Sequence, residues 1–127
     1  MQKAIFVVDD SETDLAKVAS VLETKYKVLT MTSPGKMFLL LEKGLPHMIL
    51  LDIEIPKMNG IDVMIKLKAN PAWQNIPVLF ITGWTDEMIL ADALEAGGLD
   101  VISKPIVSSI LLNRVTNYLN GVASCKK

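Results

Sequence analysis

The sequence predicts an α/β domain built around a parallel sheet, and two observations favour this class. Short segments are continuously apolar, which is typical of strands buried on both faces of a parallel sheet. These segments are residues 4–8, 48–51, 76–81 and 99–102. Segments with helical spacing of apolar residues fill the gaps, so that strand and helix alternate five times. That alternation is the pattern of right-handed β-α-β crossovers.

The fifth predicted strand covers residues 26–30 and differs from the others. Its apolar residues alternate with Lys27 and Thr30 instead of forming a continuous run. Alternation predicts a strand at an edge of the sheet or one covered on a single face.

The predicted helices have recognisable starts and stops. Capping residues or a proline predict helix starts at Ser11, Ser33-Pro34, Gly60, Thr85-Asp86 and after Pro105. Glycine or Asn-Pro follows three of them, at residues 44, 70–71 and 97–98. Five helices are therefore expected between and after the strands.

Composition limits the possible functions. A chain of 127 residues fits one domain, and its net charge of −1 gives no field that would attract nucleic acid or an anionic membrane. The only cysteine is Cys125, so no disulfide can form within the chain. The first apolar run is too short for a signal peptide and no run approaches the ~20 residues of a membrane span. We therefore expect a cytoplasmic protein without nucleic-acid or membrane partners.

Polar side chains follow four of the predicted strands. Asp9 and Asp10 follow the first, Asp52 and Thr82 end the runs at 48–51 and 76–81, and Lys104 follows the last. The carboxyl ends of parallel strands meet at one edge of the sheet, where ligands of open α/β folds bind. We expect these five side chains to converge there.

The chemistry of such a cluster points to phosphoryl transfer. Three crowded carboxylates repel one another unless a cation lies between them, and oxygen-only ligands favour Mg²⁺. A metal, an ammonium and a hydroxyl around one acid provide what that acid needs to act as a phosphoryl acceptor. Asp52 is the expected nucleophile, because it ends a buried strand and the chain turns at Pro56.

At this point the sequence resembles the receiver domain of two-component response regulators (CheY-like). The matching segments run in the order of that family and extend over nearly the whole chain. They are Val7-Val8-Asp9-Asp10-Ser11, Leu50-Leu51-Asp52, Pro56-Lys57-Met58-Asn59-Gly60, Ile81-Thr82 and Lys104-Pro105.

The resemblance implies a flavodoxin-like (βα)5 fold with strand order 2-1-3-4-5. It implies that Asp52 accepts a phosphoryl group from a sensor histidine kinase or phosphotransfer protein and later loses it, without the domain being an enzyme in the usual sense. Asp10, Asp52 and the backbone carbonyl of Glu54 would bind Mg²⁺, with Asp9 acting through a water molecule. Thr82 and Lys104 would contact phosphoryl oxygens, and the bond before Pro105 would be cis.

Three residues depart from the common pattern or vary within it. Val101 stands where the family often has an aromatic switch residue. Either valine is simply tolerated there, or coupling between Asp52 and the output face is weaker or uses backbone movement of the 82–85 loop. Glu54 and Trp84 flank the path of water to the phosphoryl group. Trp84 is predicted either to shield that group and prolong its lifetime or to contact a partner.

Three consecutive apolar residues in the fourth helix predict a docking surface. Met88, Ile89 and Leu90 spread over roughly 200° of a helix, so at least one must stay exposed. With Ile110 they would form an output face on the fourth helix, fifth strand and fifth helix, for a target protein or a homodimer. We expect a receiver domain over residues 1–120, a tail at 121–127 and no output domain in this chain.

Two other readings compete with a phosphorylation switch. A pseudo-receiver would act only as an interaction module, but such a module has no physical reason to crowd three acids. A phosphatase with an aspartyl nucleophile and Mg²⁺ is faintly suggested by Asp52-Ile53-Glu54. In those enzymes the nucleophile lies on the first strand, which is not the order found here.

Overall fold

Five strands alternate with five helices in the computed structural model, which describes residues 2–83 and 86–121. The strands are β1 (Ala4–Val8), β2 (Lys27–Met31), β3 (Met48–Asp52), β4 (Val78–Thr82) and β5 (Asp100–Ser103). The helices are α1 (Glu12–Leu22), α2 (Pro34–Leu41), α3 (Gly60–Ala69), α4 (Glu87–Glu95) and α5 (Ser108–Leu119). Each predicted element is present, with bounds that differ from the prediction by a few residues.

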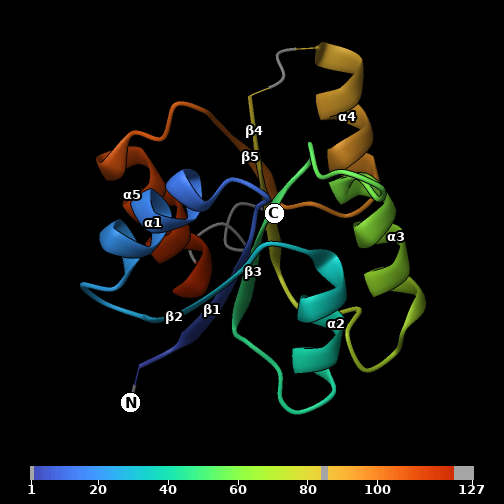
Figure 1. Cartoon of the computed structure of the whole chain (residues 1–127), viewed down its shortest axis with the longest axis horizontal. Helices are drawn as coiled ribbons and strands as arrows, with labels where there is room; N and C mark the ends of the chain where they lie inside the picture. The colour runs from blue at the N-terminus through green and yellow to red at the C-terminus, as the bar shows by residue number, and fades with distance from the viewer. Residues whose placement is uncertain (1, 84–85, 122–127) are drawn as a thin grey trace.

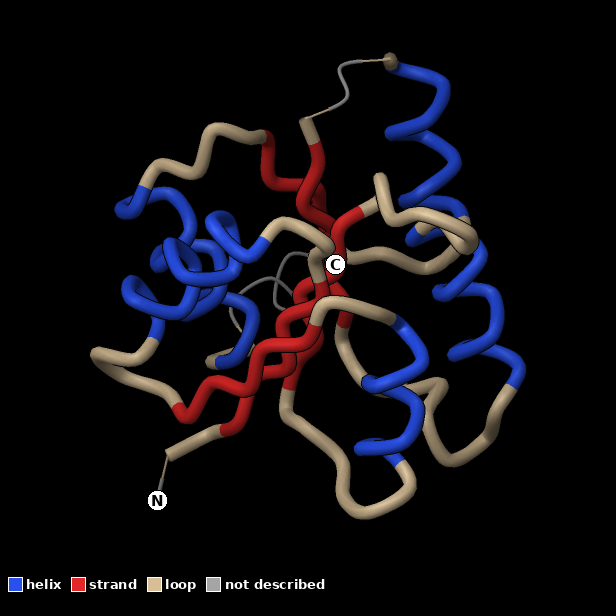
Figure 2. The backbone as a smooth tube through the Cα atoms, viewed as in Figure 1, coloured by secondary structure: helices blue, strands red, loops and turns tan. Residues whose placement is uncertain are grey.

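All neighbouring strands are parallel, and their order is β2-β1-β3-β4-β5. Helices α1 and α5 cover one face of the sheet, and α2, α3 and α4 cover the other (Figure 1). Figure 2 shows the sheet as the central layer between the two helical layers. The predicted flavodoxin-like order is therefore confirmed.

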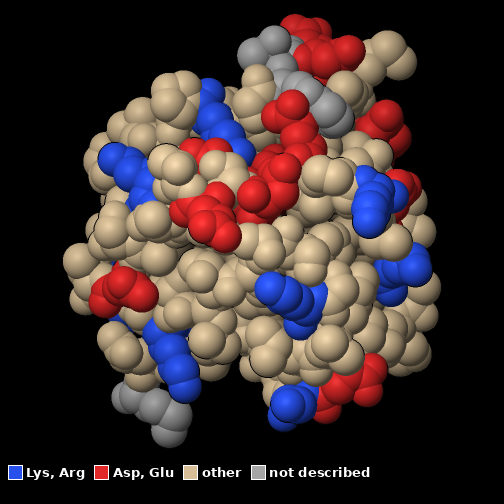
Figure 3. Space-filling model, viewed as in Figure 1, with Lys and Arg blue, Asp and Glu red and all other residues tan. Residues whose placement is uncertain are grey.

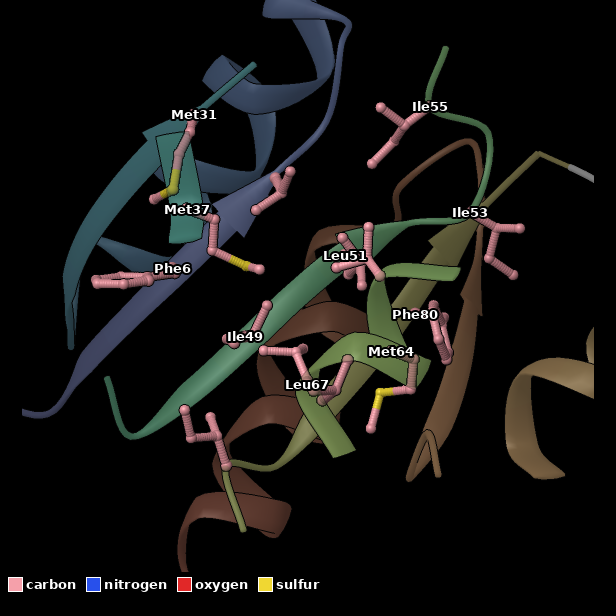
Figure 4. Close-up of a cluster of buried hydrophobic side chains, with 14 of the residues drawn as sticks. Phe6, Met31, Met37, Ile49, Leu51, Ile53, Ile55, Met64, Leu67 and Phe80 are labelled. Atoms are coloured by element: carbon pink, nitrogen blue, oxygen red, sulfur yellow. The ribbon is translucent and has the colours of Figure 1, made fainter. Parts of the chain in front are cut away.

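The strand pleat divides the core into two clusters. In β3, Met48 and Leu50 pack toward α1 and α5, whereas Ile49 and Leu51 pack toward α2 and α3. Figure 4 shows the second cluster, in which strand residues meet side chains of α2 and α3. Because both faces are covered, every residue of β3 and β4 is buried. This explains why these segments are continuously apolar.

The two edge strands differ from the interior ones. β2 lies at one edge and three of its five residues are exposed, as its alternation predicted. β5 lies at the other edge, with only Ile102 buried and Leu99 before it 45% exposed. The prediction that this run is buried on both faces was wrong, because strand order, which the local pattern does not encode, places it at an edge.

Side-chain caps start four of the helices. Ser11, Ser33, Asn59 and Asp86 each accept a hydrogen bond from a backbone N–H in the first turn of the helix that follows. Asn59 caps α3 although only Gly60 was singled out from the sequence. None of these helices, nor α5, is long and apolar enough to cross a membrane.

Candidate phosphoacceptor site

Three carboxylates meet at the carboxyl edge of the sheet. Asp9 and Asp10 follow β1, Asp52 ends β3, and one oxygen of each lies within 4.8 Å of the others. Asp9 and Asp52 are 1% and 2% exposed, whereas Asp10 faces solvent. Figure 3 shows acidic side chains gathered over this end of the sheet. The predicted acid cluster is confirmed as a geometric feature.

Strand register explains why the two buried acids are neighbours. β1 and β3 are adjacent, and Val8 pairs with Leu51, so the next residues, Asp9 after β1 and Asp52 at the end of β3, lie side by side at the edge of the sheet. Backbone N–H groups then fix each carboxylate. The N–H of Ser11 donates to Asp9 Oδ1 at 2.9 Å, and the N–H of Glu54 donates to Asp52 Oδ1 at 3.0 Å.

Lys104 lies at the centre of a three-way ion pair. Its Nζ is 2.9 Å from Asp9 Oδ2, 3.1 Å from Asp52 Oδ2 and 2.8 Å from Asp14 Oδ2. Its backbone N–H donates to the carbonyl of Thr82 at 2.8 Å, which fixes Lys104 to the end of β4. The predicted cis bond between Lys104 and Pro105 is present.

Burial shifts the pKa of Asp52 and that of Lys104 each in one direction, and their hydrogen bonds to each other and to neighbouring groups shift each in the other. Burial raises the pKa of Asp52 from 3.8 to about 7 and the nearby charge of Asp9 adds to it, although the Glu54 N–H and Lys104 oppose the rise. Burial lowers the pKa of Lys104, but its hydrogen bonds to Asp14, Asp9 and Asp52 outweigh burial, so the pKa is raised. Lys104 is therefore a firmly charged ammonium. It is shared among three acids, so it does not fully stabilise the charge of Asp52.

The loop between β3 and α3 packs against the backbone at Asp52. Gly60 begins α3 directly against the backbone of Asp52, and a Cβ at this position would lie 2.5 Å from the Asp52 carbonyl oxygen. The N–H of Gly60 donates to the carbonyl of Ile53 at 2.9 Å, which closes the loop. In the same loop, Glu54 Oε1 accepts a hydrogen bond from the N–H of Gly83, which follows β4, at 3.2 Å. The Glu54 side chain therefore joins the loops that follow β3 and β4.

Two other predicted site residues, Thr82 and Val101, differ in how deeply they are buried. Thr82 is fully buried at the end of β4. Val101 is partly buried against the core and lines a groove with Ile110 and Arg114. The Arg114 Nη1 atom is 3.0 Å from Asp100 Oδ2. Trp84 lies outside the described residues.

The predicted docking residues are not equally accessible. Met88 is 75% exposed and Ile110 is 45% exposed, whereas Ile89 and Leu90 are partly buried and Ile89 packs against the core. The expectation that at least one of the three consecutive residues stays exposed is confirmed.

Asp14 is the site residue that sequence reasoning missed. It lies in the first turn of α1, for which only the capping residue Ser11 was singled out from the sequence. The available signal was positional, because the helix after β1 begins at the edge of the sheet where Asp9 and Asp52 gather.

Comparison with known proteins supports this arrangement. Residues 5–116 match the family model described as the response regulator receiver domain. The chain is a response regulator receiver domain. It is 30% identical over 93% of its length to protein RcaC of Microchaete diplosiphon, and 29% identical over 92% to protein PilH of Pseudomonas aeruginosa. It spans 18% of RcaC and 98% of PilH, and less than a third of several other curated relatives.

A solved structure agrees with the fold of this receiver domain. A putative response regulator from Chloroflexus aurantiacus superposes with a TM-score of 0.89 at 26% identity, covering 94% of this chain and 99% of that one. Receiver domains are phosphorylation-dependent signalling modules that typically bind Mg²⁺ at an acidic pocket. Asp9, Asp10 and Asp52 form an acidic cluster whose all-oxygen donor set suits a hard divalent cation.

Proposed function

We propose that Asp52 accepts the phosphoryl group that switches this domain. The observation that carries the proposal is the position of Asp52. It is a buried carboxylate at the end of a central strand, held by the Glu54 N–H and facing an ammonium and two further acids. Asp9 contacts Lys104 as closely as Asp52 does and accepts the Ser11 N–H in a similar way, so the substitution test below decides between the two buried acids.

Transfer of the phosphoryl group to Asp52 is a substitution at phosphorus that needs no oxidant and no added base. An oxygen of Asp52 forms a bond to phosphorus while the P–N bond of a phosphohistidine breaks, and the electron pair of that bond stays on the histidine ring. Lys104 would pair with one phosphoryl oxygen, and the Thr82 hydroxyl would donate a hydrogen bond to another. The later loss of the group requires attack by water at the same phosphorus.

Asp10, Asp52 and the backbone carbonyl of Glu54 would hold Mg²⁺, with Asp9 contributing through a water molecule. When bound, Mg²⁺ would supply positive charge beside the oxygens of the transferring group. The exposed position of Asp10 supports this assignment, because it gives a hydrated ion a route into the pocket.

The output surface would be formed by α4, β5 and α5. Met88 and Ile110 are exposed apolar side chains on this side, as is Val107 before α5, so a target protein or a second copy of the chain could bury them. Ile89 and Leu90 would contribute less, because they are partly buried. We propose that the domain acts through such contacts in the cytoplasm and has no output activity of its own.

Intact-mass measurement tests the phosphoacceptor assignment. The protein is incubated with acetyl phosphate and Mg²⁺, with Asp52→Asn as the variant and Asp62→Asn as a control acid in the first turn of α3. We expect one added phosphoryl group in wild type and in the control, and none in Asp52→Asn or without Mg²⁺. Equal gain in Asp52→Asn would overturn the proposal.

A further inference from the structure

Asp14 makes the shortest of the three contacts to Lys104, although it belongs to a helix and not to a strand end. Its Oδ2 atom lies 2.8 Å from Lys104 Nζ. The backbone N–H of Asp14 donates to Ser11 Oγ at 3.2 Å, so the helix cap fixes the position of the residue. The contact is therefore built into the start of α1.

The hydrogen-bonding capacity of Lys104 is fully used in this arrangement. An ammonium has three N–H donors, and Asp9, Asp14 and Asp52 supply three acceptors. In an aspartyl phosphate, a phosphoryl oxygen lies two bonds beyond the carboxylate oxygen that is bonded to phosphorus, and so farther out than the Asp52 oxygen that Lys104 now contacts. Lys104 must therefore give up or lengthen an existing contact to reach it.

The exposure of the three acids indicates which contact gives way. The side chains of Asp9 and Asp52 are 2% exposed, and each also accepts a backbone N–H. The side chain of Asp14 is 35% exposed, so water can replace Lys104 there at little cost. A buried acid that lost Lys104 would remain desolvated and unpaired.

We propose that Asp14 is a positioning residue that competes with the phosphoryl group for Lys104 and thereby favours the unphosphorylated state. The inference rests on the proposed function, because it assumes that Lys104 contacts the phosphoryl group on Asp52. It adds a fourth acid to the site, one that acts through Lys104 and does not touch the reacting atoms.

Beryllofluoride, a tetrahedral phosphoryl analogue, tests the proposal without turnover. Its dissociation constant in the presence of Mg²⁺ is measured by ¹⁹F NMR for wild type, Asp14→Asn and Glu12→Gln. Glu12 is the matched control, since it is an exposed acid in the same first turn with no ion pair to Lys104 among the contacts described. We expect Asp14→Asn to bind roughly 3- to 10-fold more tightly, as for the loss of a partly exposed charged contact, and Glu12→Gln to change by less than about twofold.

A second measurement separates competition for Lys104 from simple repulsion of the anion by Asp14. Urea unfolding of Asp14→Asn, Lys104→Met and the double variant gives the coupling between the two residues. We expect the two substitutions to be coupled by roughly 2- to 10-fold in the folding equilibrium constant.

The possible results distinguish the role of Asp14 from the proposed function itself. Unchanged or weaker analogue binding by Asp14→Asn, or an absence of coupling to Lys104, would overturn the role of Asp14 alone. Failure of wild type to bind the analogue with Mg²⁺ would overturn the proposed function, and the role of Asp14 with it.

Discussion

Substituting Gly60 by alanine should destabilise the protein and displace the backbone at Asp52. Gly60 starts α3 with its Cα directly against the end of β3. The added methyl would lie 2.5 Å from the carbonyl oxygen of Asp52 and 2.9 Å from the Cα of Ile53. Both are backbone atoms, so no side-chain rotation can relieve the contact.

The expected cost follows from how far the backbone must move. A distance of 2.5 Å is about 0.9 Å shorter than the 3.4 Å at which ordinary contact begins, so α3 or the end of β3 must shift by nearly that amount. Overpacking of this kind typically costs about 1–3 kcal/mol. Alanine also favours a helix over glycine by up to ~1 kcal/mol, which offsets part of the loss.

Gly35 is the matched control for this substitution. It is the second residue of α2, it is exposed, and a Cβ there would meet nothing within 4 Å. Gly35→Ala should therefore leave the protein unchanged or stabilise it by about 0.4–1 kcal/mol, through the lower entropy of the unfolded chain.

Urea unfolding and phosphorylation by acetyl phosphate measure the two consequences. We expect Gly60→Ala to lower the unfolding free energy and to slow phosphorylation, because the shift begins at Asp52 itself, whereas Gly35→Ala should do neither. A Gly60→Ala protein as stable as Gly35→Ala, with wild-type phosphorylation, would refute the role given to this contact.

Three further predictions concern charge and coupling. Burial raises the pKa of Asp52 to about 7, so the folded state binds this proton more tightly than the unfolded state. Without Mg²⁺, the unfolding free energy of wild type should therefore decrease as the pH rises from 4 to 7. Asp52→Asn should remove that loss and exceed wild type by on the order of 4 kcal/mol more at pH 8 than at pH 4 in urea unfolding; a pH-independent difference would contradict this. At pH 8, Mg²⁺ should raise the unfolding midpoint of wild type but not of Asp10→Asn, and equal shifts would remove Asp10 from the metal site. Beryllofluoride with Mg²⁺ should change the amide chemical shift of Gly83 more than that of Val101, because valine cannot make the aromatic movement; the reverse order would rule out coupling through the loop after β4.

The sequence predicted the sheet and the acid cluster because both depend on patterns along the strands. Continuous apolar runs are required where two helical layers cover a sheet, and the acids mark the points where those runs end. Asp9 and Asp52 were expected to converge on these grounds alone. Their neighbouring register in β1 and β3 then brings them together.

Features that depend on contacts between elements do not follow from the local pattern of residues, and the strand order was implied only by the family resemblance. The exposure of β5 follows from strand order, and the pairing of Asp14 with Lys104 follows from how α1 begins against the sheet. The bond from Gly83 to Glu54 likewise joins two loops that are 29 residues apart. A residue pattern specifies the face that a side chain occupies but not its partner on another element.

The central claim, that Asp52 carries the phosphoryl group, is tested most directly by mapping the modified residue. Borohydride reduces an aspartyl phosphate to homoserine, and trypsin separates the candidate acids into the peptide of residues 44–57, which contains Asp52, and that of residues 4–17, which contains Asp9, Asp10 and Asp14. We expect homoserine at position 52 only, and only after treatment with acetyl phosphate and Mg²⁺. Homoserine in the peptide of residues 4–17, with Asp52 unchanged, would contradict the account.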